Sequence, residues 1–231
     1  MSSFAAIVLA AGKGSRMNSD VHKQYMNLAG KPVIYYSLKA FSDSPVDEIV
    51  LVTGVGEQEY CRRELIEKYQ FTKVTHIVEG GAERYHSVYQ GLMACANAEY
   101  VMIHDGARPF VTQDIICRAM EDVPRSRANI AAVPVKDTIK MTDETNCVTD
   151  TPRRDRLWSV QTPQTFETTL LKNAYEVMMK QEDADITDDA MVVERYGGYK
   201  VHVIMGDYRN IKLTTPEDLL IGEIFATEKN G

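Results

Sequence analysis

Short apolar runs alternate with amphipathic stretches along most of the chain. Runs typical of buried strands lie at 4–11, 47–53, 73–78, 99–104, 128–134 and 199–205. Stretches with apolar residues at helical spacing lie at 32–41, 57–69, 167–181 and 185–195. A last helix is expected to begin at Pro216, with Thr215 as its cap. Strand and helix alternating in this way predict a doubly wound α/β fold with a mostly parallel sheet.

The alternation breaks after residue 134. Residues 135–142 and 147–152 are half polar and flank a polar turn at 143–146, a pattern that predicts an extended β-hairpin. Because an isolated two-stranded ribbon is only marginally stable in water, we expect this arm, at about 135–156, to pack on a partner. An interlocked homodimer is the simplest such partner. The rest of 1–231 shows no linker or repeat and is expected to form a single domain.

Composition narrows the class of protein. The chain has 231 residues, 44% of them hydrophobic and 26% charged, as in globular proteins. Its formal net charge of -7 argues against nucleic acid or an anionic membrane as a partner. We find no apolar run long enough to span a membrane and no signal peptide, so we expect a cytoplasmic protein. The four cysteines have no metal-binding or CxxC spacing and are expected to be reduced.

Ligands bind such sheets at the carboxyl ends of the strands, and the first strand is followed by an unusual loop. Small residues and glycines leave backbone N–H groups accessible to phosphate oxygens, because no large side chain blocks the approach. Two basic side chains follow and add positive charge. The residues concerned are Ala10, Ala11, Gly12, Gly14, Arg16 and Lys23.

Other interpretations of this loop stay open at this point. A dinucleotide-binding GxGxxG fingerprint would need a third glycine where Met17 stands. A P-loop would need four spacer residues followed by Gly-Lys-Ser/Thr, and that motif is absent. An isolated GxG is also common in tight turns that bind nothing. The loop alone therefore leaves a phosphate site, a nicotinamide-dependent oxidoreductase and a plain turn as candidates.

Three later segments carry candidate chemistry. Gly81 and Ser87 lie in a glycine-rich segment that could hold a base or a ribose, although an ordinary connector is an equal alternative. Asp105 and Arg108 follow a strand and form either a buried ion pair or a metal and phosphate site; their position favours the second. The arginines at 153, 154 and 156 indicate an anion site, with interface ion pairs as the alternative.

Several sequence blocks, taken together and in order, resemble the bacterial 2-C-methyl-D-erythritol 4-phosphate cytidylyltransferases of the non-mevalonate isoprenoid pathway. The blocks are AAGKGSRM, HKQY, GGAERYHSV, HDGARPF, PVKDTIK, LWSVQTPQTF, ITDDAMVVE and NIKLTTPEDL. Ribitol-5-phosphate cytidylyltransferases share TPQ, NIK-x-TTP and a similar HD-x-x-RPF. We favour the methylerythritol family because HDGARPF is followed by VPVKDT, and because TDDA replaces TDAC.

The resemblance implies a reaction that joins CTP to the phosphate of a sugar alcohol, releases pyrophosphate and uses Mg²⁺. A phosphate monoester has a second pKa of about 6, so it is already a dianionic nucleophile near pH 7 and needs no general base. The enzyme must instead bring two polyanions together and neutralise the charge that develops on them. Positive residues are therefore expected to dominate the site.

The resemblance also implies roles for individual residues. Arg16 and Lys23 would grip the triphosphate and stabilise the transition state, beside nucleotide-binding backbone at 10–14. Gly81 and Ser87 would read cytosine and ribose. The acceptor phosphate would be surrounded by Arg108, Thr162, Thr187 and Lys212, the last also reaching toward the α-phosphate.

Two further implications concern the metal and the arm. Asp105 lies where the family places an aspartate near metal and substrate, so it is a tentative Mg²⁺ ligand. The arm of one subunit would lend Thr138 and an arginine to the site of the other subunit. Counting back four positions from Trp158 selects Arg154 as this arginine, with Arg153 and Arg156 as neighbouring alternatives. A non-catalytic nucleotide sensor would need neither Lys212 nor the arginine cluster.

Overall fold

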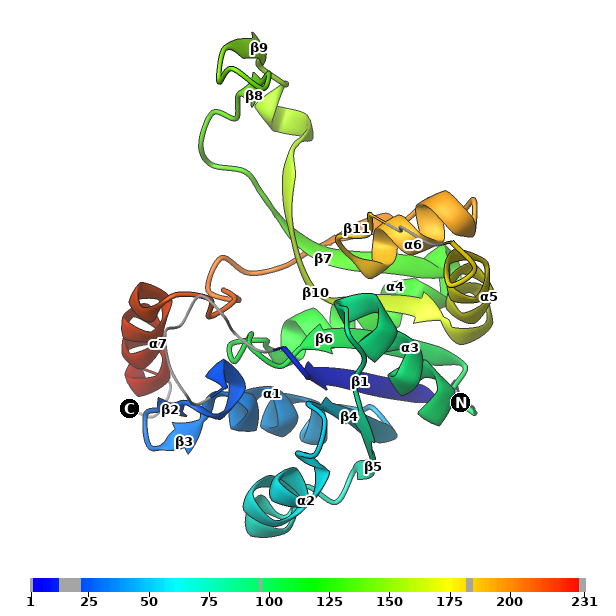
Figure 1. The fold of residues 1–231 in the computed structure, drawn as a ribbon, viewed down its shortest axis with the longest axis vertical. Coiled ribbons are helices and arrows are strands. Elements are labelled where there is room, and N and C mark those ends of the chain that lie inside the picture. Colours follow the sequence, from blue (N-terminus) through cyan, green and yellow to red (C-terminus); the bar gives the residue numbers. More distant parts are fainter. Residues whose placement is uncertain (1, 13–21, 96, 182–184, 229–231) are drawn as a thin grey trace.

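The computed structural model describes residues 2–12, 22–95, 97–181 and 185–228. In this part of the chain, seven strands form one sheet in the order β11-β7-β10-β6-β1-β4-β5 (Figure 1). All neighbouring pairs are parallel except those of β10, which is antiparallel to β6 and β7. The prediction of an α/β fold with a mostly parallel sheet is confirmed. The strands are β1 (Phe4–Ala10), β4 (Glu48–Thr53), β5 (Val74–Glu79), β6 (Tyr100–Asp105), β7 (Ala128–Pro134), β10 (Trp158–Glu167) and β11 (His202–Met205).

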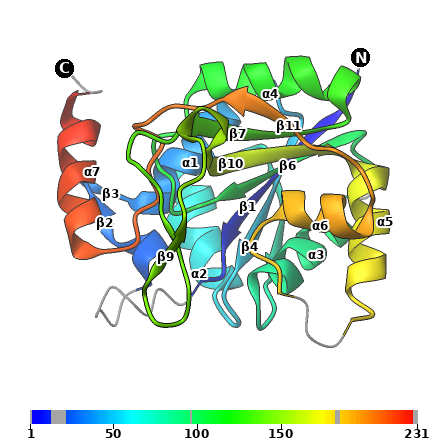
Figure 2. The same cartoon turned by 90° about the horizontal axis from the view of Figure 1, so that it is seen from above.

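Helices cover both faces of this sheet (Figure 2). One face carries α1 (Val33–Ser42), α4 (Gln113–Ser126) and α2 (Gln58–Cys61), which continues as a π-helix, η3 (Arg62–Glu67). The other face carries α3 (Arg84–Ala94), α5 (Thr168–Met178) and α6 (Asp189–Tyr196). The sequence pattern had placed the start of α6 several residues earlier, at 185.

The alternating directions of side chains explain why β1 is apolar throughout. Ala6 and Val8 belong to the core beneath α1 and α4, whereas Ala5 and Ile7 belong to the core beneath α3 and α5. Successive side chains of a strand point to opposite faces, so a central strand covered on both faces needs apolar residues at every position. This burial anchors the first strand and holds the loop that follows it at the sheet's edge.

A smaller apolar cluster lies at the end of the sheet. It joins the short strand β2 (Asn27–Leu28), which pairs with β3 (Lys31–Pro32), and the first residues of α1 to the last helix, α7 (Pro216–Glu228). Leu28, Leu213 and Ala226 are buried there. The predicted start of α7 is confirmed, and the Asp218 N–H donates to the Thr215 hydroxyl over 3.4 Å. Among the described helices, none is long and apolar enough to cross a membrane.

The segment after β7 leaves the body of the protein and forms the arm (Figure 1). Its strands β8 (Met141–Thr142) and β9 (Val148–Asp150) are antiparallel and are followed by a 3₁₀ turn, η4 (Arg154–Arg156). The hairpin is therefore shorter than the sequence pattern predicts, because strand pairing stops at these few residues. Half-polar strands that bury nothing have no packing to sustain a longer ladder. Met141 and Val148 are 54% and 59% exposed.

Candidate active site

A cavity of about 590 Å³ opens at the carboxyl ends of β1 and β6. Its walls come from the loops after β1, β4, β5 and β6, together with the segment just before α7. The lining residues are Leu9, Ala10, Ala11, Gly12, Lys23, Gln24, Val55, Gly80, Gly81, Ala82, Glu83, Arg84, Ser87, Asp105, Ala107 and Lys212. This is the location that a doubly wound sheet predicts for a ligand.

The segment that carries Lys23 is anchored at two points. It forms a short 3₁₀ helix, η2 (Lys23–Tyr25). Directly after Lys23, the Gln24 side-chain amide donates to the Ala10 carbonyl oxygen. The Tyr25 hydroxyl donates to the Glu57 carboxylate over 2.7 Å. These bonds hold the backbone of η2 against the end of β1, and Lys23 lines the cavity. Gly14 and Arg16, predicted for the same loop, lie outside the described residues.

The loop after β5 packs closely against the loop after β1. A Cβ atom on Gly80 would lie 2.5 Å from the Ala11 Cβ, so only glycine permits this approach. The Gly80 N–H donates to the Thr53 carbonyl over 2.8 Å, and the Gly81 N–H donates to the Ser87 hydroxyl over 3.1 Å. Glu83 caps α3 through a reciprocal capping box with His86. The loop is thus held by its own hydrogen bonds.

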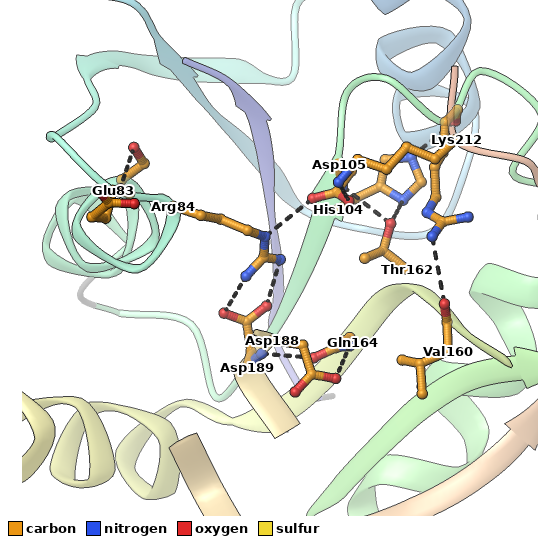
Figure 3. Close-up of polar contacts among 12 residues, drawn as sticks. Glu83, Arg84, His104, Asp105, Val160, Thr162, Gln164, Asp188, Asp189 and Lys212 are labelled. Carbon is orange, nitrogen blue, oxygen red and sulfur yellow. Dashed lines mark hydrogen bonds and ion pairs between the residues drawn. The ribbon is translucent and has the colours of Figure 1, made fainter. Parts of the chain in front are cut away.

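A network of charged side chains forms another wall of the cavity (Figure 3). The two Asp105 carboxylate oxygens are divided between cations: Arg84 Nε lies 3.3 Å from Oδ1, and Lys212 Nζ lies 2.8 Å from Oδ2. Arg84 also makes a two-pronged ion pair with Asp189, at 3.0 and 2.8 Å. Burial alone would raise the pKa of Asp105, but Arg84 and then Lys212 outweigh it and hold this pKa well below its usual range.

Asp189 ties this network to the start of α6. Its side chain is fully buried and accepts a 2.6 Å hydrogen bond from the Tyr175 hydroxyl. Its backbone N–H donates to the Gln164 side-chain oxygen over 3.0 Å. Asp188 caps α6 by accepting from the Met191 N–H over 2.9 Å. Thr187, predicted to bind substrate, directly precedes this cap and is exposed.

Behind Asp105, a chain of hydrogen bonds joins β6 to β10. The Asp105 N–H donates to the Thr162 hydroxyl over 3.1 Å, and this hydroxyl lies 3.1 Å from His104 Nδ1. His104 Nε2 faces the Arg108 carbonyl oxygen at 3.1 Å and therefore carries the proton. A neutral imidazole satisfies both contacts, and burial lowers the pKa of His104 to about 4.

Arg108 extends from the same turn toward the segment before α7. One of its terminal nitrogens donates to the Asn210 carbonyl over 2.8 Å. Its Nε is buried and has no hydrogen-bond partner among the described residues. Burial lowers the pKa of Arg108, against an opposing effect of Asp105. A guanidinium with an unused buried donor is suited to an anionic ligand.

The predicted site residues fall into four groups. Lining the cavity are Ala10, Ala11, Gly12, Lys23, Gly81, Ser87, Asp105 and Lys212. Thr162, Arg108 and Thr187 do not line it: the Thr162 hydroxyl accepts from the Asp105 N–H, the Arg108 N–H donates to the Asp105 carbonyl, and Thr187 directly precedes the cap of α6. Thr138 and Arg154 lie on the exposed arm and do not line the cavity of their own chain, and Arg154 donates to the Lys136 carbonyl over 3.0 Å. Gly14 and Arg16 are outside the described residues.

Sequence reasoning missed the part of the network formed by Arg84, Asp189 and Gln164. Arg84 stands in the glycine-rich block GGAERYHS, and Asp189 follows the cap of α6, so each has an ordinary local explanation. A signal was present in Gln164, because a glutamine within a strand buried on both faces needs polar partners. Its amide provides them by bonding Asp189, Ala190 and Asp188.

The cavity has few possible metal ligands. Across the described residues, no group of three or more His, Cys, Asp or Glu side chains could hold a metal ion. Of the residues that the structure describes, Asp105 and Glu83 are the carboxylates that line the cavity. Mg²⁺ usually keeps several waters and binds through one or two carboxylates together with substrate phosphates. Both Asp105 oxygens are already paired with Arg84 and Lys212, so a magnesium ion would share one of these oxygens and take its other ligands from phosphate groups.

The buried neutral histidine predicts a pH-dependent stability. In the unfolded chain His104 takes up a proton near the ordinary histidine pKa of 6.5, whereas in the folded chain its pKa is about 4. Acidification through this window should therefore remove about 3 kcal/mol of folding free energy. Denaturant unfolding of wild type and His104→Gln at several pH values measures this. The variant should have a flatter dependence between pH 4 and 6.5, and equal slopes would contradict the assignment.

The comparisons with known proteins agree over nearly the whole chain. The family model for 2-C-methyl-D-erythritol 4-phosphate cytidylyltransferase matches residues 4–228. The Lachnospira eligens enzyme of this name is 53% identical over 222 residues, covering 95% of this chain and 97% of the relative. The Lachnoclostridium phytofermentans enzyme is 46% identical over 228 residues, covering 99% and 98%.

Solved structures give the same result. 4-Diphosphocytidyl-2C-methyl-D-erythritol synthase from Anaerococcus prevotii has a TM-score of 0.86 and 32% identity, covering 98% of this chain and 96% of its own. The Thermus thermophilus 2-C-methyl-D-erythritol 4-phosphate cytidylyltransferase has a TM-score of 0.77 and 28% identity, covering 96% and 98%. With the family model, the close relatives and the shared fold in agreement, this chain belongs to the 2-C-methyl-D-erythritol 4-phosphate cytidylyltransferase family.

Proposed function

We propose that this protein transfers the cytidylyl group of CTP to 2-C-methyl-D-erythritol 4-phosphate. The products are 4-diphosphocytidyl-2-C-methyl-D-erythritol and pyrophosphate. Besides family membership, one observation carries this proposal: the cavity joins a backbone surface of small residues to cationic side chains. Such a site suits a nucleoside triphosphate and a second phosphate rather than a hydride donor.

The chemistry requires positioning more than proton transfer. An oxygen of the acceptor phosphate attacks the α-phosphorus of CTP, and the bond between the α-phosphorus and its bridging oxygen breaks. The bonding electrons leave with pyrophosphate. Because the acceptor monoester is already dianionic near pH 7, no side chain has to remove a proton. Rate acceleration comes from holding the two anions in line and from stabilising the charge that develops on the oxygens.

Lys23 and Lys212 supply that charge from two elements. Lys23 lies beside the nucleotide-binding backbone of Ala10 to Gly12, where it would bind the triphosphate together with Arg16. Lys212 pairs with Asp105, which orients the ammonium group at the cavity wall. From there it would contact the acceptor phosphate and the α-phosphate. The two lysines would thus act on both sides of the phosphorus at which the reaction takes place.

The neighbouring groups form the acceptor side of the site. Arg108 would use its unpartnered Nε for the acceptor phosphate. Thr187, which precedes the cap of α6, would contribute its hydroxyl group. The Thr162 hydroxyl already bonds the Asp105 N–H and His104, so Thr162 would act by holding Asp105 in place. On the nucleotide side, Gly81 and Ser87 would bind cytosine and ribose through the loop that packs on Ala11.

Mg²⁺ would be held by Asp105 and by phosphate oxygens. The ion supplies positive charge that offsets the negative charge of the triphosphate. Lys23 and Lys212 would neutralise the remaining negative charge of the phosphate groups. Removal of divalent ions with EDTA is accordingly expected to abolish pyrophosphate release, and added Mg²⁺ should restore it.

We further propose that the arm makes a homodimer and completes the site of the partner. In support, the arm stands away from the body, exposes the apolar side chains of Met141 and Val148, and carries Thr138 and Arg154 outside the cavity of their own chain. A two-stranded ribbon with exposed apolar side chains gains stability when these side chains pack on another subunit. The cytoplasmic location stays a prediction from the sequence.

Pyrophosphate release from CTP and Mg²⁺ tests the function directly. The assay should be run with 2-C-methyl-D-erythritol 4-phosphate and, in parallel, with ribitol 5-phosphate. We expect rapid release with the first acceptor and little with the second. Release with ribitol phosphate alone would keep the reaction class but overturn the assigned acceptor. Release with neither, under conditions where the protein is folded, would overturn the proposed function.

A further inference from the structure

Arg84 lies beside the residues that would bind the acceptor phosphate, which include Asp105 and Lys212. Its Nε contacts Asp105, and its two terminal nitrogens contact Asp189 (Figure 3). Asp189 is fully buried at the start of α6, and Asp105 is largely buried at the end of β6. One guanidinium therefore joins three elements, because Arg84 itself begins α3.

The geometry of this contact constrains Lys212. The Asp105 carboxylate has two oxygens, and Arg84 and Lys212 occupy opposite ones. A carboxylate held at one oxygen by a rigid, planar guanidinium cannot rotate freely, so the direction of its second oxygen is set as well. The ammonium group of Lys212 follows that oxygen. The position of Lys212 thus depends on Arg84 through Asp105.

The loop that would bind cytosine and ribose does not depend on this contact. The loop after β5 is held by hydrogen bonds from Gly80 to Thr53 and from Gly81 to Ser87, and α3 is capped by Glu83. None of these bonds uses the Arg84 side chain. Its guanidinium leaves the loop and reaches toward β6 and α6. Loss of that guanidinium should therefore disturb the pair of Asp105 and Lys212, and with it the binding of the acceptor phosphate, more than the binding of cytosine and ribose.

We propose that Arg84 is a positioning residue for the acceptor phosphate, acting through Asp105 on Lys212 and through Asp189 on the segment that precedes α6. This inference rests on the proposed cytidylyl transfer. Arg84 need not touch either substrate for this role. If Arg84 formed a purely structural ion pair, its loss would lower only the stability of the protein. If Arg84 bound the nucleotide, its loss would raise the KM for CTP.

Steady-state kinetics of Arg84→Met and Arg84→Lys test the proposal. Misplacement of a catalytic group by about 1 Å can cost about 10²-fold in rate, so we expect Arg84→Met to lower kcat/KM for the acceptor by about that factor. The KM for CTP should rise less than the KM for the acceptor, because the loop that would bind cytosine and ribose keeps its own bonds. Arg84→Lys should recover only part of the loss, since a single ammonium cannot bind both aspartates as the forked guanidinium does.

A double-mutant cycle shows whether Arg84 acts through Lys212. If it does, Arg84→Met and Lys212→Met should be strongly non-additive in acceptor kcat/KM, because removal of Lys212 leaves little for Arg84 to position. Tyr175→Phe is the matched control: it removes the 2.6 Å bond to Asp189 but keeps the contact between Arg84 and Asp105. This control should retain most of the acceptor kcat/KM even where it lowers the melting temperature.

Several outcomes would overturn the inference. These are additive effects in the cycle, a rise in the KM for CTP equal to that for the acceptor, or unchanged kinetics in Arg84→Met well below its melting temperature. If Arg84→Met does not fold, the test rests on Arg84→Lys. Wild-type kcat/KM for the acceptor in that variant would contradict the proposed role of Arg84. A wild-type protein that releases no pyrophosphate would refute the proposed function, a failure distinct from these.

Discussion

Replacing Lys23 by alanine is expected to lower kcat for cytidylyl transfer by about 10²–10³-fold, as expected for loss of one group that stabilises transition-state charge. Lys23 lines the cavity next to the backbone of Ala10 and Ala11. The fold should survive, because the side chains of Gln24 and Tyr25 hold η2 in place. Steady-state pyrophosphate release gives the kinetic effect, and thermal unfolding reports the stability.

Lys31→Ala is a suitable control for the Lys23 variant. Lys31 lies on β3, where its ammonium group is 4.8 Å from the centre of the Tyr69 ring, and it does not line the cavity. The control should keep wild-type kcat. Lys23→Arg should keep the charge and recover part of the rate. Wild-type turnover in a folded Lys23→Ala protein would remove Lys23 from the mechanism.

A heterodimer of Lys23→Ala and Arg154→Ala subunits is expected to be active although each homodimer is nearly inactive. If the arm completes the partner's site, the heterodimer combines an intact Lys23 from one chain with an intact Arg154 from the other at one of its sites. The other site lacks both side chains. Activity should therefore recover to about half that of the wild-type dimer, because one of two symmetric sites is restored.

Co-expression with two affinity tags would yield the heterodimer for this measurement. An inactive heterodimer would show that Arg154 serves its own chain or only the interface. Arg153→Ala is the control for the arm, since its guanidinium is engaged by Asp155 at 3.1 and 2.6 Å. Loss of activity in this control and not in Arg154→Ala would exchange the roles of the two arginines.

The part of the site next to β1 could be predicted from the sequence because its residues are close together along the chain. Ala10 ends β1, Ala11 and Gly12 follow it, and Lys23 comes only a few residues later in the chain. In a parallel sheet, the chain leaves β1 at the edge where ligands bind, so position along the sequence already implies position in the site. The structure places these residues in one cavity.

The charged network could not be read in the same way. Arg84 and Asp189 are 105 positions apart, and each has a local role in its own helix start. Their pairing depends on how closely α3, α6 and β6 pack. β10 was also difficult to predict, because Gln161 and Gln164 are buried polar residues that break the apolar pattern of a central strand. Their hydrogen bonds to Asp207 and Asp189 exist only after folding.

Local sequence patterns alone predicted the α/β class, most strands and helices and the protruding arm. These follow from hydrophobic periodicity, glycine and local charge, all of which act over a few residues. The contacts of Arg84 with both Asp105 and Asp189, and of Lys212 with the second Asp105 oxygen, could not be predicted from the sequence and became visible in the folded structure. Such contacts depend on distances of a few ångströms between elements far apart in sequence, and these distances are set by the packing of the whole core.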